Sequence, residues 1–294
     1  MRAILFLLWL LHWLPLPVLG RIGKCLGMAA YWLHKDRRHI ALTNLRLCFP
    51  DMPEEERVRL AKAHFQAYGR SVVERGILWW SSYERVMRLI RVEPAFPFEA
   101  VAEGPVIFLC PHFVCLEIPG IVVGVNSGGS SIYIKQKNKL TDKMLRHGRS
   151  RFNKGVLLLS RKEGVKPIIR SLRKKIPFYM LPDMDFGRKE KDAVFTSFFG
   201  QQAATLTALA RIAAVTGARV IPVIATFLPG YEGWQVRFYP PWENFPGEDI
   251  EAATRYMNEF IEQRILEHPE EYYWMHRRFK TRPPGFPDVY KETP

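Results

Sequence analysis

The side chains best suited to acid–base chemistry stand in the segment PVIFLCPHFVCLEIPG, residues 105–120. A strand-like apolar run ends at Cys110, Pro111 turns the chain, and His112 stands where the next helix should begin. Glu117 follows five residues after His112, which on one continuous helix would put the two about 140° apart. With His112 on the loop and Glu117 on the first turns of the helix, the carboxylate can reach the imidazole and hold it as a general base. The alternative is a packed histidine beside a surface glutamate.

The sequence disfavours a metal site and the other common kinds of catalytic site. Cys110, His112 and Cys115 could ligate a metal, but the distal ligand pair that structural zinc sites need is missing. The segment GVNSG at 124–128 places its serine outside the GxSxG position, and the chain holds neither a P-loop nor a GxGxxG after a strand. We therefore expect no metal ion and no dissolved cofactor.

The charge of the chain points to an anionic partner. Lys and Arg number 43 against 29 Asp and Glu, so the formal net charge is +14. A membrane surface, a phosphorylated substrate or an acidic carrier protein would all suit this charge. Nucleic acid is not expected, because no zinc-finger spacing, RNA-binding signature or basic-plus-heptad segment is present. The four cysteines form no CxxC pair, which is typical of a reducing compartment.

The N-terminus has the composition of a membrane segment. Residues 3–19 are apolar except for His12 and are interrupted by Pro15 and Pro17, with basic residues after them. No small-x-small cleavage site follows, so we expect the segment to be retained and residues 1–33 to form an anchor with an interfacial helix. Spanning the membrane and lying in its interface both remain open. The basic flank favours a body on the cytoplasmic side.

The rest of the chain, residues 34–294, is expected to be one α/β domain. A long amphipathic helix is predicted over 54–80 and a late one near 250–265. Between them, short apolar runs alternate with helical patterns, which favours a sheet flanked by helices. The predicted strands are 106–110, 131–135, 156–160, 177–181, 219–227 and 234–239, and the predicted helices between them are 116–125, 140–152, 165–174 and 203–216.

Several segments carry a resemblance to one family. They are NLRLCFPDMPEEER (44–57), HFVCLEIPG (112–120), QKNKLTD (136–142) with HGRSR (147–151), LPDMDFG (181–187), FFGQQAATLTALARIAAVTGARVIPV (198–223) and HPEEYYWMHRRFKTRP (268–283). In this order the chain resembles the lipid A biosynthesis lauroyl/myristoyl acyltransferases from about residue 20 to its end, and His112 with Glu117 resembles their His-x-x-x-x-Asp/Glu box. The resemblance implies a glycerolipid-acyltransferase-like fold with a mixed sheet flanked by helices.

The resemblance also implies an activity. An acyl chain between lauroyl and palmitoyl length (C12–C16) would leave the thioester of acyl carrier protein and esterify the hydroxyl of a primary acyl chain on a Kdo-lipid IVA-type precursor. This would take place at the cytoplasmic face of the inner membrane, in contact with its lipids. His112 would be the base and Glu117 its partner, and Arg149 would face the negative charge that develops on the carbonyl oxygen. Binding of phosphate or carrier protein is the alternative role for Arg149.

Four further residues are candidates for substrate binding: Asn138, Arg151, Asp183 and Asp185. Met184 stands where the family commonly has glutamine, so a hydrogen bond from that position is in doubt. Phe195, Phe198 and Phe199 could line a dry slot for the acyl chain, with ordinary core packing as the alternative.

Two rival functions remain open at this stage. The same base could acylate another lipid, such as a lysophospholipid or a different glycolipid. The chain could also be a membrane protein that binds anionic lipid without turnover.

Overall fold

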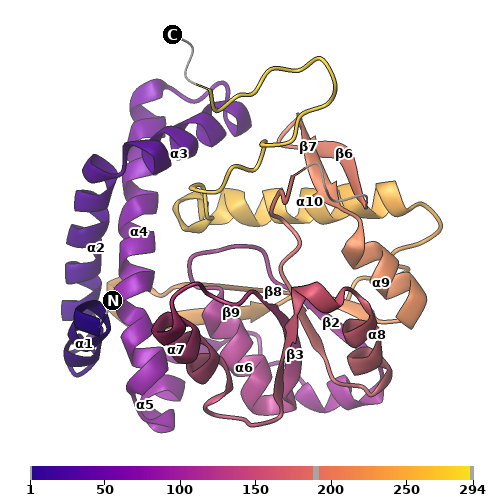
Figure 1. The fold of residues 1–294 in the computed structure, drawn as a ribbon, viewed down its shortest axis with the longest axis horizontal. Coiled ribbons are helices and arrows are strands. Elements are labelled where there is room, and N and C mark those ends of the chain that lie inside the picture. Colours follow the sequence, from indigo (N-terminus) through magenta and orange to yellow (C-terminus); the bar gives the residue numbers. More distant parts are fainter. Residues whose placement is uncertain (1, 188–191, 292–294) are drawn as a thin grey trace.

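A computed structural model describes residues 2–187 and 192–291, and seven of its strands form one mixed sheet (Figure 1). The five strands from β8 to β4 run parallel, whereas β9 is antiparallel to β8 and parallel to β1. This confirms the predicted α/β class with a mixed sheet flanked by helices. The strands in spatial order are β1 (Ile90–Val92), β9 (Trp234–Phe238), β8 (Arg219–Phe227), β2 (Val106–Leu109), β5 (Phe178–Met180), β3 (Gly129–Tyr133) and β4 (Val156–Ser160).

Strand β2 lies at the centre of the sheet and is buried on both faces. Ile107 and Leu109 belong to the apolar cluster on one face, and Val106 and Phe108 to the cluster on the other, as expected for a strand whose side chains alternate. Burial on both faces explains why its sequence is continuously apolar. It also fixes the point at which the chain leaves the sheet toward His112.

Helices and a separate two-stranded hairpin surround the sheet (Figure 1). The predicted helices over 54–80, 116–125, 140–152 and 165–174 and the late helix are confirmed within a few residues. The helices after the N-terminal pair are α3 (Lys35–Cys48), α4 (Glu54–Trp80), α5 (Tyr83–Arg88), α6 (Glu117–Ser127), α7 (Lys139–Ser150), α8 (Lys166–Arg173), α9 (Ala208–Thr216) and α10 (Ile250–Glu267), and short 3-10 turns are η1 (Phe98–Glu103), η2 (Arg161–Glu163), η3 (Pro229–Tyr231) and η4 (Pro269–Glu271).

The hairpin replaces part of a predicted helix. β6 (Ala193–Phe198) pairs antiparallel with β7 (Gln201–Leu206), so the helix expected over 203–216 begins only at Ala208. Ala203 and Ala204 are buried. Alanine-rich sequence favours a helix in isolation, but pairing with β6 and burial of these alanines override that propensity.

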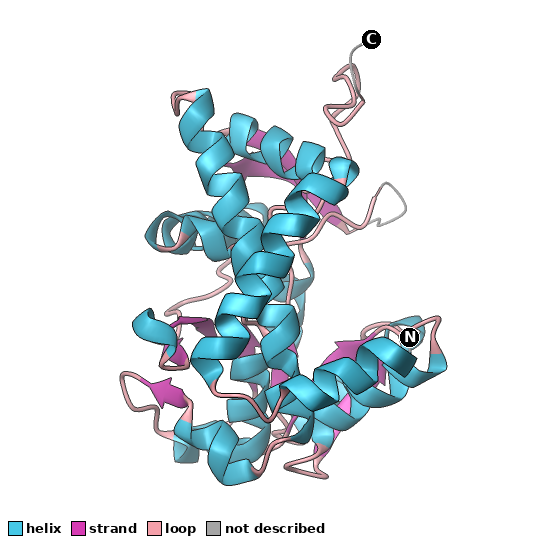
Figure 2. Ribbon diagram, turned by 90° about the vertical axis from the view of Figure 1, so that its left-hand side faces the viewer, coloured by secondary structure: helices cyan, strands magenta, loops and turns pink. Residues whose placement is uncertain are grey.

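Two N-terminal helices precede this body, α1 (Arg2–Leu11) and α2 (Leu16–Leu33). α2 lies along α4, and Figure 2 shows these helices in front of the sheet. Glycines allow the close approach: a Cβ on Gly27 would lie 2.1 Å from the carbonyl oxygen of Phe65, and one on Gly69 would lie 2.3 Å from that of Gly23. The backbones of α2 and α4 are therefore in direct contact.

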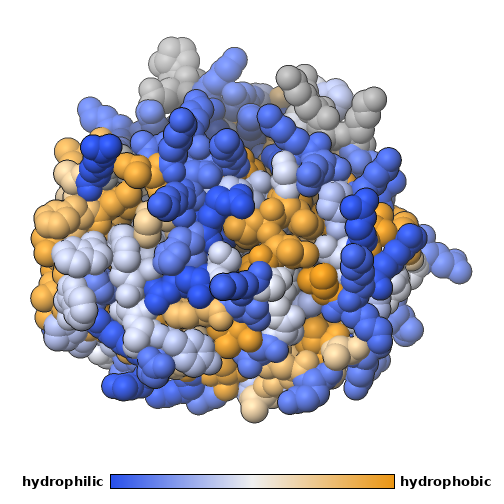
Figure 3. Space-filling view, turned by 60° about the horizontal axis from the view of Figure 1, so that its bottom comes forward, coloured by the Kyte–Doolittle hydropathy of each residue, from blue (hydrophilic) through white to orange (hydrophobic). Residues whose placement is uncertain are grey.

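The outer faces of α1 and α2 are apolar and exposed. α1 buries none of its residues, and large exposed side chains continue into α2. Figure 3 shows hydrophobic side chains gathered along the left-hand margin, where Figure 1 places these helices. The exposed residues are Ile4, Phe6, Leu7, Trp9, Leu10, Trp13, Val18, Leu26, Trp32 and Leu33. Within residues 2–187 and 192–291, no helix combines the length and the apolar character that crossing a membrane requires.

Candidate functional site

His112 lies on the loop that follows β2, and it is paired with an aspartate. Its Nδ1 is 2.6 Å from Asp183 Oδ1, and its backbone N–H donates to Asp183 Oδ2 at 2.9 Å. Asp183 follows β5, the parallel neighbour of β2, and the carboxyl ends of parallel neighbours lie at the same edge of a sheet. The imidazole is 15% exposed, so one edge of the ring remains open to a substrate.

Asp183 is buried and holds a stable negative charge. Its side chain is 1% exposed, and the hydroxyl of Tyr272 donates to Oδ2 at 3.0 Å. Burial alone would raise the pKa of Asp183, but the positive charge and the hydrogen bonds of His112 outweigh it and lower that pKa to about 2. Burial, followed by the charge of Asp183, raises the pKa of Tyr272, so its hydroxyl stays a donor. Asp183 therefore orients His112 with its Nδ1 hydrogen fixed and Nε2 left for chemistry.

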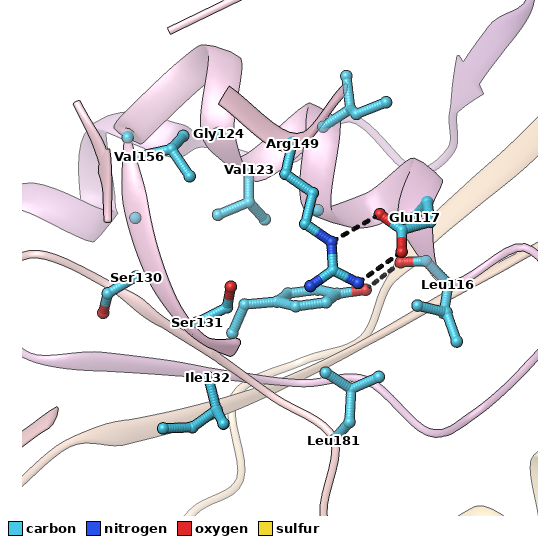
Figure 4. A pocket seen from close by; sticks show the side chains of 15 residues that line it. Leu116, Glu117, Val123, Gly124, Ser130, Ser131, Ile132, Arg149, Val156 and Leu181 are labelled. Carbon is cyan, nitrogen blue, oxygen red and sulfur yellow. Dashed lines mark hydrogen bonds and ion pairs between the residues drawn. The ribbon is translucent and has the colours of Figure 1, made fainter. Parts of the chain in front are cut away.

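Glu117 has a different partner from the expected one. It is the first residue of α6, and its carboxylate binds Arg149 of α7 through two hydrogen bonds, 3.0 Å to Nε and 2.6 Å to Nη2 (Figure 4). Burial alone would raise the pKa of Glu117, but the charge and hydrogen bonds of Arg149 hold it below its usual range. Glu117 in turn raises the pKa of Arg149, so both groups are charged. The sequence-based expectation that Glu117 holds His112 is therefore corrected: the imidazole is held by Asp183.

Tyr179 and Cys110 lie between the two pairs. The hydroxyl of Tyr179 is 2.7 Å from Cys110 Sγ and 2.6 Å from the carbonyl oxygen of Leu116. Burial raises the pKa of the Cys110 thiol, and the charges of Asp183 and Glu117 raise it further. Cys110 stands two residues before His112, and Leu116 directly precedes Glu117. The Tyr179 hydroxyl therefore links the loop that carries His112 to the start of α6, where Glu117 binds Arg149.

Asn138, Arg151 and Asp185 make contacts that hold the backbone. The side-chain oxygen of Asn138 accepts from the N–H groups of Leu140 and Thr141 and so caps α7. The guanidinium of Arg151 donates to the carbonyl oxygens of Leu78 and Ser81 at the end of α4. A substrate-binding role for these residues stays a prediction.

Asp185 ties the C-terminal segment to the site. Its carboxylate accepts from the backbone N–H of Thr281 at 2.6 Å and from the Thr281 hydroxyl at 2.9 Å, and its own N–H donates to His276 Nε2 at 2.9 Å. Burial, followed by the positive charge of His112, lowers the pKa of His276 to about 4, so this ring is neutral and can accept. Tyr272 and His276 were not singled out from the sequence, because only the fold brings this segment to His112.

One recess adjoins the Glu117–Arg149 pair, and another lies at the ends of two neighbouring strands. An open basin at the ends of β3 and β4 is lined by Lys135, Lys137, Arg161 and Lys162. A second, mostly apolar pocket lies between α6 and strands β3 and β4, beside Glu117 and Arg149 (Figure 4). The aromatics expected to line an acyl slot are not among its lining residues. Phe198 is buried in the core with Tyr272 and Phe279.

The cysteine–histidine set does not form a metal centre in the part of the chain that the structure describes. There, the one group of three potential ligands whose atoms lie within 4.8 Å of one another is His268, Glu270 and Glu271. The carboxylate of Glu271 already accepts from the backbone N–H of Phe227. Neither His112, Asp183 nor Cys115 belongs to this group.

Comparison with known proteins identifies close relatives over nearly the whole chain. The family described as bacterial lipid A biosynthesis acyltransferase matches residues 2–281. Lipid A biosynthesis lauroyltransferase from Escherichia coli (strain K12) is 35% identical over 287 residues, 96% of this chain and 92% of that protein. Lipid A biosynthesis palmitoleoyltransferase from the same organism is 33% identical over 286 residues, 96% and 92% of the two chains. Its lipid A biosynthesis myristoyltransferase is 30% identical over 278 residues, 94% and 84% of the two chains.

Solved structures also align with the chain, among them the crystal structure of the 1-acyl-sn-glycerophosphate (LPA) acyltransferase PlsC from Thermotoga maritima, with 16% identity and a TM-score of 0.40. The alignment covers 91% of this chain and 99% of that one.

Proposed function

The chain belongs to the bacterial lipid A biosynthesis acyltransferases and is an acyltransferase, and we propose that it takes its acyl group from acyl carrier protein. The acceptor is a hydroxyl of a primary acyl chain on a Kdo-lipid IVA-type precursor. The observation that carries the proposal is a partly exposed His112 whose Nδ1 is bound to a buried, ionised aspartate. A base of this kind, beside the Glu117–Arg149 pair, suits the transfer of an acyl group from a thioester to a hydroxyl oxygen.

His112 acts as the base in one direct transfer. Nε2 takes the proton of the acceptor hydroxyl while that oxygen attacks the thioester carbonyl carbon. The carbon–sulfur bond then breaks, and the imidazolium returns the proton to the departing thiolate. Because Asp183 is ionised, it stabilises the imidazolium while it exists. A thiolate is a good leaving group, so no covalent intermediate on the enzyme is required.

Arg149 stabilises the negative charge that develops on the carbonyl oxygen. Its Nε and Nη2 are bound to Glu117, which fixes the plane of the guanidinium. Within the described residues no hydrogen bond is formed by its Nη1, so this nitrogen is available to the oxyanion. Pre-oriented donors of this kind are worth about 3 kcal/mol of barrier each in acyl transfer. Glu117 thereby becomes a positioning residue for Arg149.

The N-terminal helices would bring the protein to the membrane that contains the lipid acceptor, and the basic basin would bind that acceptor. The apolar outer faces of α1 and α2 suit insertion into the interface of the inner membrane, and the basic flank suits its cytoplasmic face. Lys135, Lys137 and Lys162 in the basin would bind the phosphates of the acceptor. A lysophospholipid is the second candidate acceptor. Removing the phosphates from the glycolipid distinguishes the two candidates, because it should weaken binding to the basin only if the glycolipid is the acceptor.

The test is an acylation assay in detergent micelles. Purified protein is incubated with lauroyl or myristoyl acyl carrier protein and Kdo-lipid IVA, and the masses of the products are measured by mass spectrometry. Wild type should add one acyl group and His112→Ala should add none, while His34→Ala, which changes an exposed histidine, should match wild type. Acylation by His112→Ala at the wild-type rate, or no acylation of any lipid by the wild type, would overturn the proposal.

A further inference from the structure

One tyrosine, Tyr133, lies between the basic basin and the Glu117–Arg149 pair. It is the last residue of β3, its side chain is buried, and it forms part of the lining of the basin. Its ring also faces α7, where the guanidinium carbon of Arg149 lies over the ring at 5.9 Å from its centre. The same side chain therefore adjoins the recess that would bind phosphate and the arginine that would stabilise the oxyanion.

One face of α7 is arranged around this ring. Asp142, Arg146 and Arg149 follow one another at spacings of four and three residues, which places them on one side of the helix. The Tyr133 hydroxyl donates to Asp142 Oδ1 at 2.7 Å, and the guanidinium carbon of Arg146 lies 5.4 Å from the ring centre. Burial, followed by the hydrogen bond to Asp142, raises the pKa of Tyr133 to about 12, so the hydroxyl keeps its hydrogen and stays a donor. The ring thus meets α7 from its first turn to its last.

Glu117 and Tyr133 restrain different parts of the Arg149 guanidinium. The carboxylate binds its edge, through Nε and Nη2, whereas the aromatic ring faces its central carbon. A guanidinium over an aromatic face is attracted by the negative potential of that face. A carboxylate that binds only the edge leaves the guanidinium able to tilt out of the common plane, and the neighbouring ring restricts that tilt.

The carboxylate of Asp142 joins this arrangement to the loop that lines the basin. Besides the Tyr133 hydroxyl, Asp142 Oδ1 accepts the backbone N–H of Gln136 at 2.7 Å. Gln136 lies between Lys135 and Lys137, which are exposed and also line the basin. A phosphate bound by these two lysines would fix the backbone between them and, through the shared carboxylate, the tyrosine ring.

We propose that phosphate binding in the basin is coupled to the orientation of Arg149 through Asp142 and Tyr133. Tyr133 is then a positioning residue, because it acts on the reaction only through the guanidinium. The inference rests on the proposed function and adds the step at which a phosphate of the acceptor acts: it raises kcat as well as lowering KM. Binding energy from a remote part of a substrate has this effect when it orders a group that stabilises the transition state.

The test measures kcat and KM for the glycolipid acceptor with and without its phosphates. In wild type, loss of the phosphates should lower kcat by about fivefold or more, which is the usual size of a coupling between two sites. Tyr133→Phe keeps the ring beside Arg149 but has no hydroxyl for Asp142. The two acceptors should then differ by less than about twofold in kcat, while KM still depends on phosphate. Tyr133→Leu should in addition lower kcat with the phosphorylated acceptor, because the ring itself is lost.

Two comparisons separate the coupling from a loss of structure. Asp142→Asn keeps an oxygen that can accept both the Tyr133 hydroxyl and the Gln136 N–H, so it should retain the phosphate dependence of kcat, whereas Asp142→Ala should lose it. Tyr256→Phe is the matched control, because it removes the hydroxyl of a tyrosine that is 49% exposed on α10, and it should behave as wild type.

Two results would overturn the coupling and leave the proposed function intact. One is a phosphate dependence of kcat that persists in Tyr133→Phe. The other is a wild type in which removal of the phosphates changes only KM. If the wild type transfers no acyl group to any lipid, the proposed function fails instead.

A second measurement does not depend on any variant folding. Inorganic phosphate is added to wild-type protein that acts on the acceptor without phosphates. Phosphate ions that occupy the basin should raise kcat, whereas sodium chloride at the same ionic strength should not. Equal effects of the two salts would show that an occupied basin does not act on Arg149 and would overturn the proposal.

Discussion

Replacing Asp183 with asparagine should remove most of the activity by disabling His112. Burial opposes ionisation of Asp183, yet His112 lowers its pKa from 3.8 to about 2. The net shift corresponds to about 2 kcal/mol, and the coupling itself is larger because burial acts in the opposite direction. The part of this shift that comes from the His112 ring also stabilises the imidazolium that forms during transfer. An interaction of about 2 kcal/mol corresponds to about 30-fold in kcat when it is lost.

A second consequence of this variant enlarges the effect. Asparagine can offer an N–H to Nδ1, which favours the tautomer with its hydrogen on Nε2, where the base is needed. The same change in a Ser-His-Asp triad costs about 10⁴ in kcat. The expected range for Asp183→Asn is therefore from about 30-fold to about 10⁴-fold.

The assay is kcat for the acylation of Kdo-lipid IVA, followed from about pH 5 to pH 9. In Asp183→Asn the acidic limb of the profile should move to lower pH, because the protonated ring has lost its counter-charge. A purely structural role would lower the rate without moving the limb. Asp51→Asn, which changes an exposed aspartate, is the matched control. A folded Asp183→Asn protein that keeps more than one third of wild-type kcat would refute the assignment.

Three further predictions concern other contacts of the protein. Glu117→Gln and Arg149→Gln should each lower kcat, and the double variant should be no worse than the worse single, because each single leaves one charge without its partner. Asn138→Ala should lower the free energy of unfolding by about 1 kcal/mol, measured by denaturant titration, since it removes the cap of α7; a higher KM for the acceptor would in addition support substrate contact. Burial raises the pKa of Glu74 to about 7 and that of Glu271 to about 8. Each of these two carboxyl groups keeps a proton in the folded protein that the unfolded chain loses near pH 4.5. Burial also lowers the pKa of His64 and of His276 to about 4, which offsets this effect up to about pH 6.5. The thermal midpoint should therefore fall as pH rises from about 6.5 to 8, and Glu271→Gln should flatten that fall.

The fold was largely readable from the sequence because its periodicities are strong. β2 and β8 are buried on both faces and read as continuous apolar runs, and α4 repeats its apolar residues at helical spacing. The exception is residues 203–206, where local composition favours a helix and pairing with β6 produces a strand. The local composition of residues 203–206 does not reveal this hairpin pairing.

The site was readable in part. The position of His112 after a buried strand predicted a reactive loop, and the structure has it there. Its partner is 71 residues away along the chain, and only the placement of β5 beside β2 brings the two together. The resemblance of His112 and Glu117 to the His-x-x-x-x-Asp/Glu box suggested a pair, but α6 begins at Glu117 and its carboxylate binds Arg149 on α7. Spacing can exclude a shared helical face, but it cannot say which strand lies next to which.

The segment HGRSR shows how the N-terminal helices can bear on the chemistry. Gly148 packs so closely on α4 that a Cβ there would lie 2.3 Å from Trp79, and Arg151 binds the carbonyl oxygens of Leu78 and Ser81. Arg149, between them, is thus held to α4 from both sides. α4 also carries α1 and α2, whose outer faces are apolar. Because α4 holds both the two apolar helices and the α7 segment, a membrane surface that bound α1 and α2 as proposed would also fix the orientation of the Arg149 guanidinium.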